Sequence, residues 1–331
     1  MKKIIIAACV IISGCANDIV TERETTVFGT RVVITVSGMP EEQAAAAIGK
    51  VFNHFRTMHR RFHAWREGEL AAVNRAIAAA ELPINISAPM SDMLALSADY
   101  GARSEHLFNP AIGRLVALWG FHADVMPDKP PAPGKISAFV ANPPTLQDMI
   151  LADGVLMDIH PRAQLDFGAI AKGVALDEAR EILRSHQIHN ALINIGGNIL
   201  ALGNNGGSPW RIELRPATTQ PSLGVIILKD GEAVATSGGG ERRFIYQGKV
   251  YHHILDWRSG ESASSTAAAV VISDDAQNAG AISDAAATAL VIANQREAAR
   301  ILQNFKISVA LRLFNDGEKK TTAPMEKRLQ R

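Results

Sequence analysis

The sequence predicts an α+β fold, because helical patterns and strand patterns fall into separate runs. Apolar residues recur at helical spacing over residues 40–104, whereas short strand-like segments follow one another through residues 191–272. A doubly wound sheet would instead alternate strands with helices. The 331 residues suffice for one large domain or two small ones. We expect one compact unit of two intimately joined subdomains.

The amino-terminal half is expected to be mainly helical. Residues 25–36 are rich in β-branched side chains and predict a strand that is interrupted at Gly29. Pro40 and two glutamates then open a helix over residues 40–62. Two shorter helices follow, and beyond them a segment with four prolines indicates an exposed loop or a joint between subdomains. These three segments are residues 70–80, 89–104 and 124–134.

The carboxy-terminal half changes to closely spaced strands. A short strand at residues 164–167 runs into a helix over residues 169–186. Two further helices are predicted near residues 279–294 and 296–304, and the polar residues 316–331 are expected to form a frayed tail. The other predicted strands are residues 191–195, 211–215, 224–228, 242–246, 250–255, 268–272 and 307–313.

The bulk composition is that of a globular protein without a strong electrostatic field. Hydrophobic residues make up 47% and charged residues 20% of the chain, and the formal net charge is +1. This balance excludes the broad basic surface that nucleic-acid-binding proteins use, so we expect no nucleic acid partner. Any anionic ligand must therefore be held by a local site.

The first fifteen residues have the features of a bacterial lipoprotein signal. Lys2 and Lys3 precede an apolar run over residues 4–12 that is too short to span a bilayer. Small residues then stand directly before Cys15, which resembles the lipobox and implies cleavage before Cys15 and a lipid on its thiol. An ordinary secretory signal or a buried amino-terminal strand is the alternative.

The cysteines agree with this interpretation. Cys9 and Cys15 both lie inside the predicted signal segment, so the rest of the chain has no thiol for a disulfide or a thiolate metal site. Such a chain suits an oxidising compartment. We expect a signal peptide over residues 1–14, a lipidated cysteine and polar tether over residues 15–24, and a single body over residues 25–315.

Lys172 stands where a phosphate would bind. The segment around it reads as a strand, a turn at Gly168 and the start of a helix, and a helix start presents unpaired N–H groups and partial positive charge. A lysine in the first turn is opposed by the helix dipole, an unfavourable placement unless the side chain faces an anion. A solvated surface lysine is the other interpretation.

Asp284 and Thr288 are candidates for a metal site. They are four residues apart on one face of a helix whose sequence is apolar almost all round. A buried carboxylate needs a partner, and a hard cation such as Mg²⁺ prefers these oxygen donors. Alternatively, Asp284 or Ser283 caps the helix and Thr288 bonds back to its own helix.

Two adjacent histidines lie on a predicted strand. Alternation directs His252 and His253 to opposite faces, so at most one of them points easily into a common site, where it could act as a general base. A zinc site is weakly supported, because no cysteine or HExxH spacing accompanies the pair. No glycine-rich Rossmann motif or P-loop occurs anywhere in the chain.

Taken together, these segments resemble the ApbE family of FAD:protein FMN transferases. The similarity runs in order over nearly the whole chain after the tether, and the joint order and spacing of the motifs carry it. The matching segments are residues 28–30, 68–74, 107–110, 118–121, 166–177, 194–198, 236–238, 252–260 and 284–290.

The resemblance implies a T-fold-like body with a central, mostly antiparallel sheet and with FAD in a cleft between the subdomains. Asp284 and Thr288 match the side-chain ligands of a magnesium ion, and Ala169 matches the position that adds a backbone carbonyl. The positions that match contacts to FAD are Phe28, Leu107, Phe108, Asn109, Asp166, Lys172 and Ile254.

Several residues depart from the family pattern. Phe28 replaces a frequent Met, Asn109 replaces an Asp, and Trp257 replaces a proline after Asp256. Gly240 stands where a tyrosine is frequent. Where other members place a tyrosine against the flavin, this chain has His63-Ala64-Trp65, and we expect Trp65 or His63 to stack on the ring.

The implied reaction is the Mg²⁺-dependent transfer of FMN from FAD to a threonine hydroxyl of an acceptor flavoprotein, with release of AMP. His253 is the candidate for assisting proton removal, and Asp256 for orienting it. The implied acceptor is a subunit of a membrane or periplasmic redox system, which fits an enzyme anchored to a membrane by lipid and facing the periplasm. A Mg²⁺-dependent FAD pyrophosphatase and a non-catalytic FAD-binding lipoprotein are the alternatives.

Overall fold

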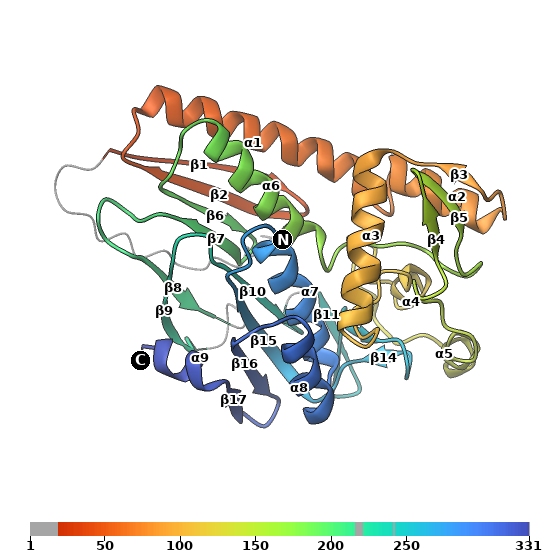
Figure 1. Cartoon of the computed structure of the whole chain (residues 1–331). Helices are drawn as coiled ribbons and strands as arrows, with labels where there is room; N and C mark the ends of the chain where they lie inside the picture. Colours follow the sequence, from red (N-terminus) through yellow and green to blue (C-terminus); the bar gives the residue numbers. More distant parts are fainter. Residues whose placement is uncertain (1–18, 216–220, 241, 331) are drawn as a thin grey trace.

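A computed structural model describes residues 19–215, 221–240 and 242–330 (Figure 1). The predicted signal peptide, the lipidation site Cys15 and most of the tether lie outside these residues. None of the described helices is both long enough and apolar enough to cross a membrane.

An eight-stranded sheet forms the centre of the molecule, and every neighbouring pair of its strands is antiparallel. This confirms the predicted α+β class with a mostly antiparallel sheet. In spatial order the strands are β1 (Val20–Val27), β2 (Thr30–Ser37), β6 (Ala191–Ile195), β7 (Asn198–Leu202), β10 (Ala233–Gly238), β15 (Thr266–Ser273), β16 (Val309–Phe314) and β17 (Lys319–Thr321).

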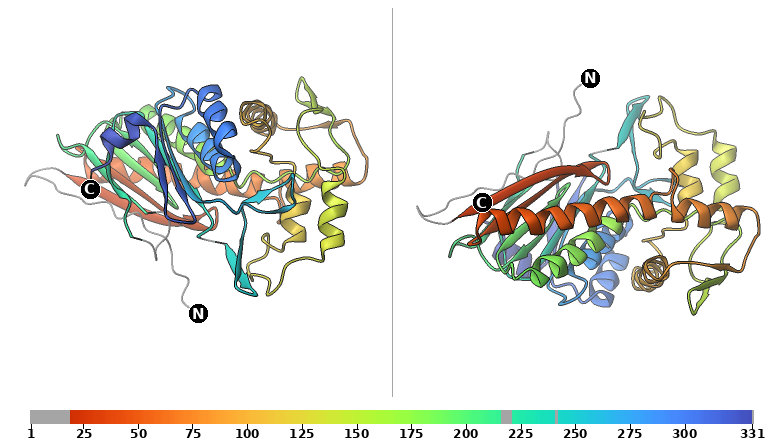
Figure 2. Two further views of the ribbon diagram at one scale, coloured as in Figure 1. Left: turned by 90° about the horizontal axis from the view of Figure 1, so that it is seen from below. Right: turned by 90° about the horizontal axis from the view of Figure 1, so that it is seen from above.

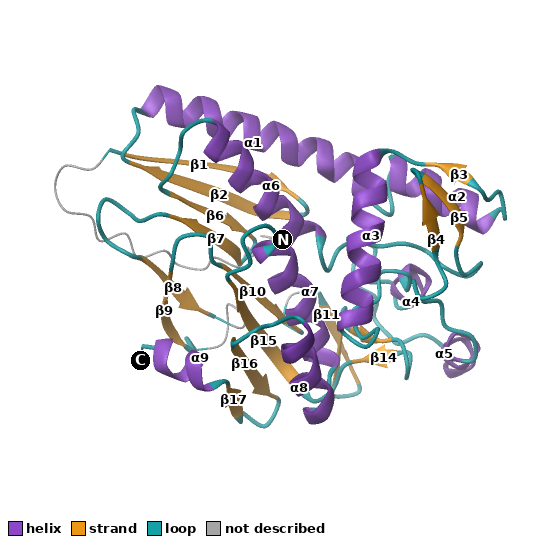
Figure 3. Ribbon diagram, in the orientation of Figure 1, coloured by secondary structure: helices purple, strands orange, loops and turns teal. Residues whose placement is uncertain are grey.

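Helices cover one face of this sheet, as Figure 3 shows. They are α1 (Glu41–Phe62), α6 (Ala171–Ser185), α7 (Ala279–Ile292) and α8 (Gln295–Asn304). Side chains of β15 alternate between the two faces: Ala269 and Val271 join the large core under the helices, whereas Val270 joins a second core on the other side. That second core is closed by the hairpin of β8 (Trp210–Leu214) and β9 (Gly224–Leu228).

A smaller subdomain lies beside the sheet (Figure 1). Its helices are α2 (Glu69–Ala78), α3 (Ala88–Arg103), α4 (Gly113–Leu118) and α5 (Pro133–Val140). Its strands are β3 (Ile84–Asn85), β4 (Ile150–Ala152) and β5 (Val155–Asp158), with the ribbons β11 (Arg243–Tyr246)–β12 (Lys249–His252) and β13 (Leu255–Asp256)–β14 (Glu261–Ser262). A third core around the buried Trp119, whose indole N–H donates to Gly260 O at 2.7 Å, holds α4 and α5 to these ribbons.

The predicted helices agree with α1, α2, α3, α6, α7 and α8, but three strand predictions need correction. The strand at residues 25–36 is the hairpin β1–β2, which turns at Phe28 and Gly29 and already begins at Val20, inside the predicted tether. Residues 164–167 form an isolated bridge to Ile112 instead of a strand, because their backbone bonds to a loop. The segment 250–255 is divided between β12 and β13.

The expected frayed tail is ordered. β17 extends the central sheet, and α9 (Ala323–Arg328) packs the fully buried Met325 into the second core. Arg328 also donates to the buried carboxylate of Glu232 at 2.8 Å. The segment is polar because β17 lies at the edge of the sheet and most of α9 is exposed. Met325 alone anchors α9 in the core.

Candidate active site

The site is organised by a close crossing of α6 and α7. A Cβ atom added to Gly173 would lie 2.3 Å from the carbonyl oxygen of Gly280, and one added to Gly280 would lie 2.3 Å from that of Gly173. No larger residue fits at either position without moving a backbone. The two glycines therefore bring the first turns of both helices into contact.

Each helix contributes a carboxylate that accepts hydrogen bonds from the backbone of the other helix. Neither α6 nor α7 has a side-chain cap of its own, which leaves backbone N–H groups of the first turn without intrahelical partners. Asp177 of α6 accepts from the N–H groups of Gly280 and Ala281, both at 2.9 Å. Asp284 of α7 accepts from the N–H of Gly173 at 3.1 Å. The crossing thus satisfies donors that would otherwise be buried and unpaired.

Lys172 lies at this crossing beside Asp284. Its ammonium is 3.5 Å from Asp284 Oδ1 and 3.3 Å from the carbonyl oxygen of Gly168. The side chain of Lys172 is 26% exposed, whereas that of Asp284 is 3% exposed. Lys172 therefore lies between the buried carboxylate and the solvent. The structure therefore favours the anion-facing interpretation of Lys172 over a free surface lysine.

Asp284 is not a helix cap, since α7 begins at Ala279 and Asp284 lies in its second turn. The Ser283 hydroxyl bonds to Gly280 O within the helix. One turn further on, the Thr288 hydroxyl lies 3.1 Å from the hydroxyl of Ser237 on β10. The predicted bond of Thr288 back to its own helix is thus replaced by a bond to the sheet.

His253 follows β12 and differs sharply from its neighbour. His252 is buried and its Nε2 lies 2.7 Å from the carbonyl oxygen of Ala263, which makes it structural. His253 Nδ1 is buried without a hydrogen-bond partner in the described part of the chain. Burial, reinforced by the charges of His252 and Lys172, lowers the pKa of His253 to about 3. The imidazole is therefore neutral at physiological pH, and the same burial disfavours its protonated form.

Asp256 does not orient His253 in this structure. Both of its carboxylate oxygens accept from the guanidinium of Arg258, at 2.9 and 2.7 Å, and Arg258 also reaches Glu297 at 2.7 Å. This arrangement ties the ribbon β13–β14 to the start of α8. We therefore correct the proposed role of Asp256 from orienting a base to anchoring this ribbon.

Trp65 and Asp166 form the side of the site where the flavin is expected. The indole N–H of Trp65 donates to Asp166 Oδ2 at 3.2 Å, and Asp166 Oδ1 accepts from the N–H of Gly168 at 2.9 Å. The ring of His122 lies against Trp65 with 4.7 Å between centroids. His63 Nδ1 accepts from the backbone of Trp65 at 3.1 Å, so His63 supports the tryptophan and Trp65 is the better candidate for stacking.

The remaining predicted contact residues are largely used by the fold. Phe28 packs its ring against Phe55 and His59, each at 5.7 Å. Leu107, Phe108 and Ile254 are buried apolar side chains, with 3%, 2% and 6% exposure. The side-chain N–H of Asn109 donates to Pro144 O at 2.9 Å, and its Oδ1 accepts from the N–H of Ala111 at 3.0 Å. These positions are used for packing and internal hydrogen bonds more than they offer free polar groups to a ligand.

The donor chemistry fits a magnesium ion shared with phosphate. Within the described residues, no three His, Cys, Asp or Glu side chains gather closely enough to hold a metal alone. Asp284 and Thr288 provide one carboxylate and one hydroxyl, and Ala169 follows Gly168 in the turn that precedes α6. Mg²⁺ is commonly held by one or two carboxylates together with substrate phosphates and water, so this sparse oxygen set is sufficient.

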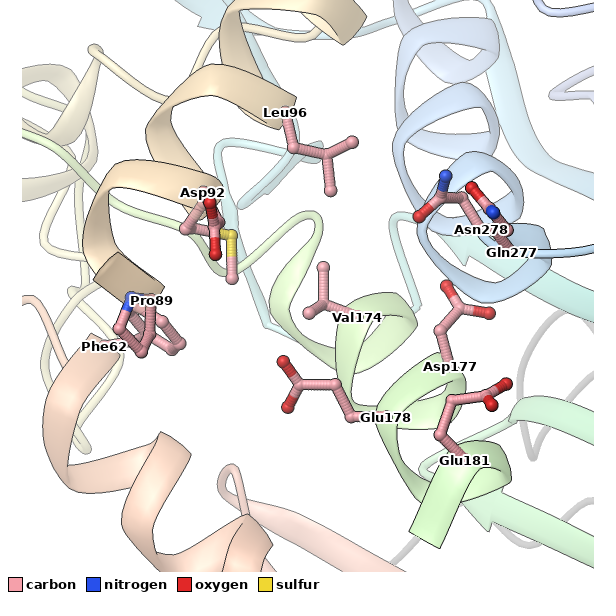
Figure 4. A pocket seen from close by; sticks show the side chains of 11 residues that line it. Phe62, Pro89, Asp92, Leu96, Val174, Asp177, Glu178, Glu181, Gln277 and Asn278 are labelled. Atoms are coloured by element: carbon pink, nitrogen blue, oxygen red, sulfur yellow. The ribbon is translucent and has the colours of Figure 1, made fainter. Parts of the chain in front are cut away.

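A separate acidic cavity of about 390 Å³ borders the other carboxylate of the crossing (Figure 4). Asp177, Glu178 and Glu181 of α6 line it together with Asp92 of α3. None of the predicted site residues lines this cavity. The two carboxylates of the crossing thus have different surroundings.

A family model described as the ApbE family matches residues 28–311. The chain belongs to the ApbE family. Its similarity to curated relatives agrees: 37% identity to an FAD:protein FMN transferase of Rhodobacter capsulatus, over 92% of this chain and 57% of the relative. A second such transferase, from Treponema pallidum, is 30% identical over 93% of this chain and 88% of its own length.

The chain spans less than two thirds of the length of the first relatives it matches, since 57% of the Rhodobacter protein and 63% of one from Klebsiella pneumoniae are covered.

Solved ApbE structures support the fold. The ApbE protein of Thermotoga maritima superposes with a TM-score of 0.82 at 24% identity, covering 94% of this chain and all of that one. The flavin transferase ApbE of Vibrio cholerae gives 0.78 at 23%, covering 95% of this chain and all of that one.

Sequence reasoning missed Ser237, Asp177 and the Gly173–Gly280 contact. Ser237 lies in the segment 236–238 that resembles the ApbE family, so its polar side chain directly before three glycines was the available signal. The contact between glycines distant in sequence has no local signature, because it depends on the packing of two helices.

Proposed function

We propose that this ApbE-family protein transfers the FMN part of FAD to a hydroxyl group of an acceptor protein. The observation that carries the proposal is the placement of the Lys172 ammonium 3.5 Å from the buried carboxylate of Asp284, at the start of α6. A diphosphate needs such a combination of a cationic side chain and oxygen donors for a metal. The transferase names of the similar relatives support the same reaction.

The residues act mainly by binding and orienting the pyrophosphate. Lys172 would hold its oxygens, and Trp65, fixed by Asp166, would support the flavin ring. Asp284, Thr288 and the Ala169 carbonyl would hold Mg²⁺, which offsets negative charge on the phosphates. Ser237 positions the Thr288 hydroxyl for this purpose.

The proposed chemistry is one displacement at phosphorus. The acceptor oxygen forms a bond to the FMN phosphorus, the bond from that phosphorus to the bridging oxygen breaks, and AMP leaves with that oxygen. The hydroxyl proton is released at the same time, and His253, whose Nδ1 has no partner among the described residues, is the group proposed to receive it. We propose threonine as the acceptor residue.

The proposed setting is a membrane surface facing the periplasm. A lipid on Cys15 would hold the enzyme there, and an acceptor subunit of a membrane or periplasmic redox system would meet it on the same side. Metabolic labelling with a lipid precursor tests this directly: label lost in Cys15→Ala supports it, and label kept in that variant contradicts it.

The test of the reaction uses intact mass. The soluble body (residues 16–331) is mixed with FAD, Mg²⁺ and a threonine-bearing flavoprotein domain. We expect the acceptor to gain the mass of one FMN, and to gain nothing when its threonine is replaced by valine. AMP release without a mass gain would instead identify a pyrophosphatase.

A further inference from the structure

The ribbon β11–β12 is a two-stranded element with one packed face and one open face. Among the described residues its strands pair only with each other. On the packed face, the rings of Phe244 and Tyr251 stack at 5.2 Å and lie against Trp119. Aromatic contacts of this kind hold the ribbon firmly on the third core.

The open face is apolar and cationic. Ile245 and Val250 are direct cross-strand partners, so their side chains lie together, with 65% and 44% exposure. Arg243 stands two residues before Ile245 on the same face, is exposed, and forms no ion pair with any described residue. The pattern is an apolar patch with, at one end, a positive charge that no residue of the described ranges pairs.

The ribbon that carries this open face leads into the proposed reaction centre. β12 leads directly into His253, whose backbone N–H donates to Arg242 O at 3.0 Å and continues the ribbon. Three residues of extended chain separate Val250 from His253, which is about 10 Å. Figure 2 shows the ribbon in cyan, projecting from the body in both views.

We propose that the open face of β11–β12 docks the acceptor protein, through an extended apolar segment of the acceptor that carries an acidic residue. This inference rests on the proposed function. A transferase that modifies a protein must hold that protein within reach of the pyrophosphate, and exposed apolar side chains beside a cationic one suit an extended segment of complementary chemistry. The apolar part of the segment covers Ile245 and Val250, and its carboxylate neutralises Arg243.

The test compares two double variants in steady-state FMN transfer. Ile245→Ser with Val250→Ser removes the apolar patch. Ile150→Ser with Met157→Ser is the matched control, since these residues of β4 and β5 have 54% and 45% exposure. We expect the KM for the acceptor to rise tenfold or more in the first variant, with kcat and the Kd for FAD unchanged, and no change in the control.

Arg243→Gln gives a second readout. Its acceptor KM should rise about threefold at low salt and match the wild type at high salt, because an exposed charge pair is screened. An unchanged acceptor KM in the Ile245/Val250 variant overturns the docking assignment even when the wild-type enzyme transfers FMN normally. Absence of transfer by the wild type would instead refute the proposed function.

The same variants distinguish other occupants of this face. Sedimentation velocity would reveal a second copy of the chain as a dimer that the Ile245/Val250 variant loses, and vesicle flotation would reveal a lipid surface. Either result with an unchanged acceptor KM overturns the proposal. We expect neither assay to separate the variant from the wild type.

Discussion

Asp177 and Asp284 occupy equivalent places at one helix crossing and have different uses. Each is buried, with 7% and 2% exposure, and each accepts backbone N–H groups from the first turn of the opposite helix. Asp177 accepts two such bonds at 2.9 Å and has Arg180 at 3.6 Å. Asp284 accepts one at 3.1 Å and has the Lys172 ammonium at 3.5 Å.

The two carboxylates differ in how many oxygen lone pairs remain without a hydrogen-bond donor from the protein. A carboxylate offers about four acceptor positions, and Asp177 uses both of its oxygens for structure. Asp284 Oδ2 accepts from one backbone N–H, and its Oδ1 has the partly exposed Lys172 ammonium at 3.5 Å. A buried carboxylate that the fold does not saturate is costly unless a ligand completes it, which is why such groups mark functional sites. We therefore propose that Asp177 contributes to stability and that Asp284 is the carboxylate that binds the cation.

The largest expected effect is on catalysis by Asp284→Asn. Loss of the carboxylate should lower the rate of FMN transfer by about a thousandfold, because the charge that holds the cation is gone. The amide is nearly isosteric, so the free energy of unfolding should change by only about 1 kcal/mol. Intact-mass kinetics and urea unfolding measure the two. A variant within tenfold of the wild-type rate would remove Asp284 from the site.

Asp177→Asn should show the opposite pattern. An amide has one acceptor oxygen, so one of the N–H groups of Gly280 and Ala281 would lose its partner in a buried place. We expect a loss of about 2 kcal/mol in unfolding free energy, with FMN transfer within about threefold of the wild type at a temperature where the variant is folded. Equal stability of variant and wild type would contradict the structural role.

The pH dependence of stability should separate the two carboxylates further. Burial raises the pKa of Asp177 from 3.8 to about 7, against the opposing effect of its backbone donors. Between these values the folded protein holds a proton that the unfolded chain has released, so stability falls as the pH rises from about 4 to about 7. From pH 5 to pH 8 the loss from this group is roughly 2 kcal/mol.

Urea unfolding at the two pH values, on wild type and on Asp177→Asn, checks this. The wild type should lose more stability than the variant as the pH rises. A variant with the same slope would show that Asp177 is ionised throughout.

A smaller effect is expected at Ser237. Ser237→Ala removes the partner of the Thr288 hydroxyl, and a single neutral hydrogen bond contributes about 1 kcal/mol. The Mg²⁺ concentration for half-maximal transfer should rise about fivefold at an unchanged maximal rate. Ser237→Thr keeps a hydroxyl on the strand and should restore the wild-type value, and failure of this rescue would count against a positioning role.

The local part of the site could be predicted from sequence. The spacing of Asp284 and Thr288, in an apolar helix, placed both on a buried face, and Gly168 with Lys172 marked a helix start. These are properties of one helix or one turn.

The contacts between residues that are distant in sequence could not be predicted. Asp177 lies in an amphipathic helix, where an acidic residue usually indicates a solvent-exposed face, yet the glycine contact buries it. β10, which carries Ser237, is rich in alanine and gives little strand signal. Pairing Asp256 with His253 by sequence proximity was wrong because Arg258 lies closer in space. Tertiary contacts decided each of these cases.

Calorimetric titration with Mg²⁺ in the presence of FAD tests the central claim most directly. Three proteins are compared under conditions where all are folded: wild type, Asp177→Asn and Asp284→Asn. We predict that the Asp177 variant binds Mg²⁺ like the wild type and that the Asp284 variant shows no saturable binding. Equal Mg²⁺ affinity in the Asp284 variant would contradict the claim that the unsaturated carboxylate of the crossing holds the cation.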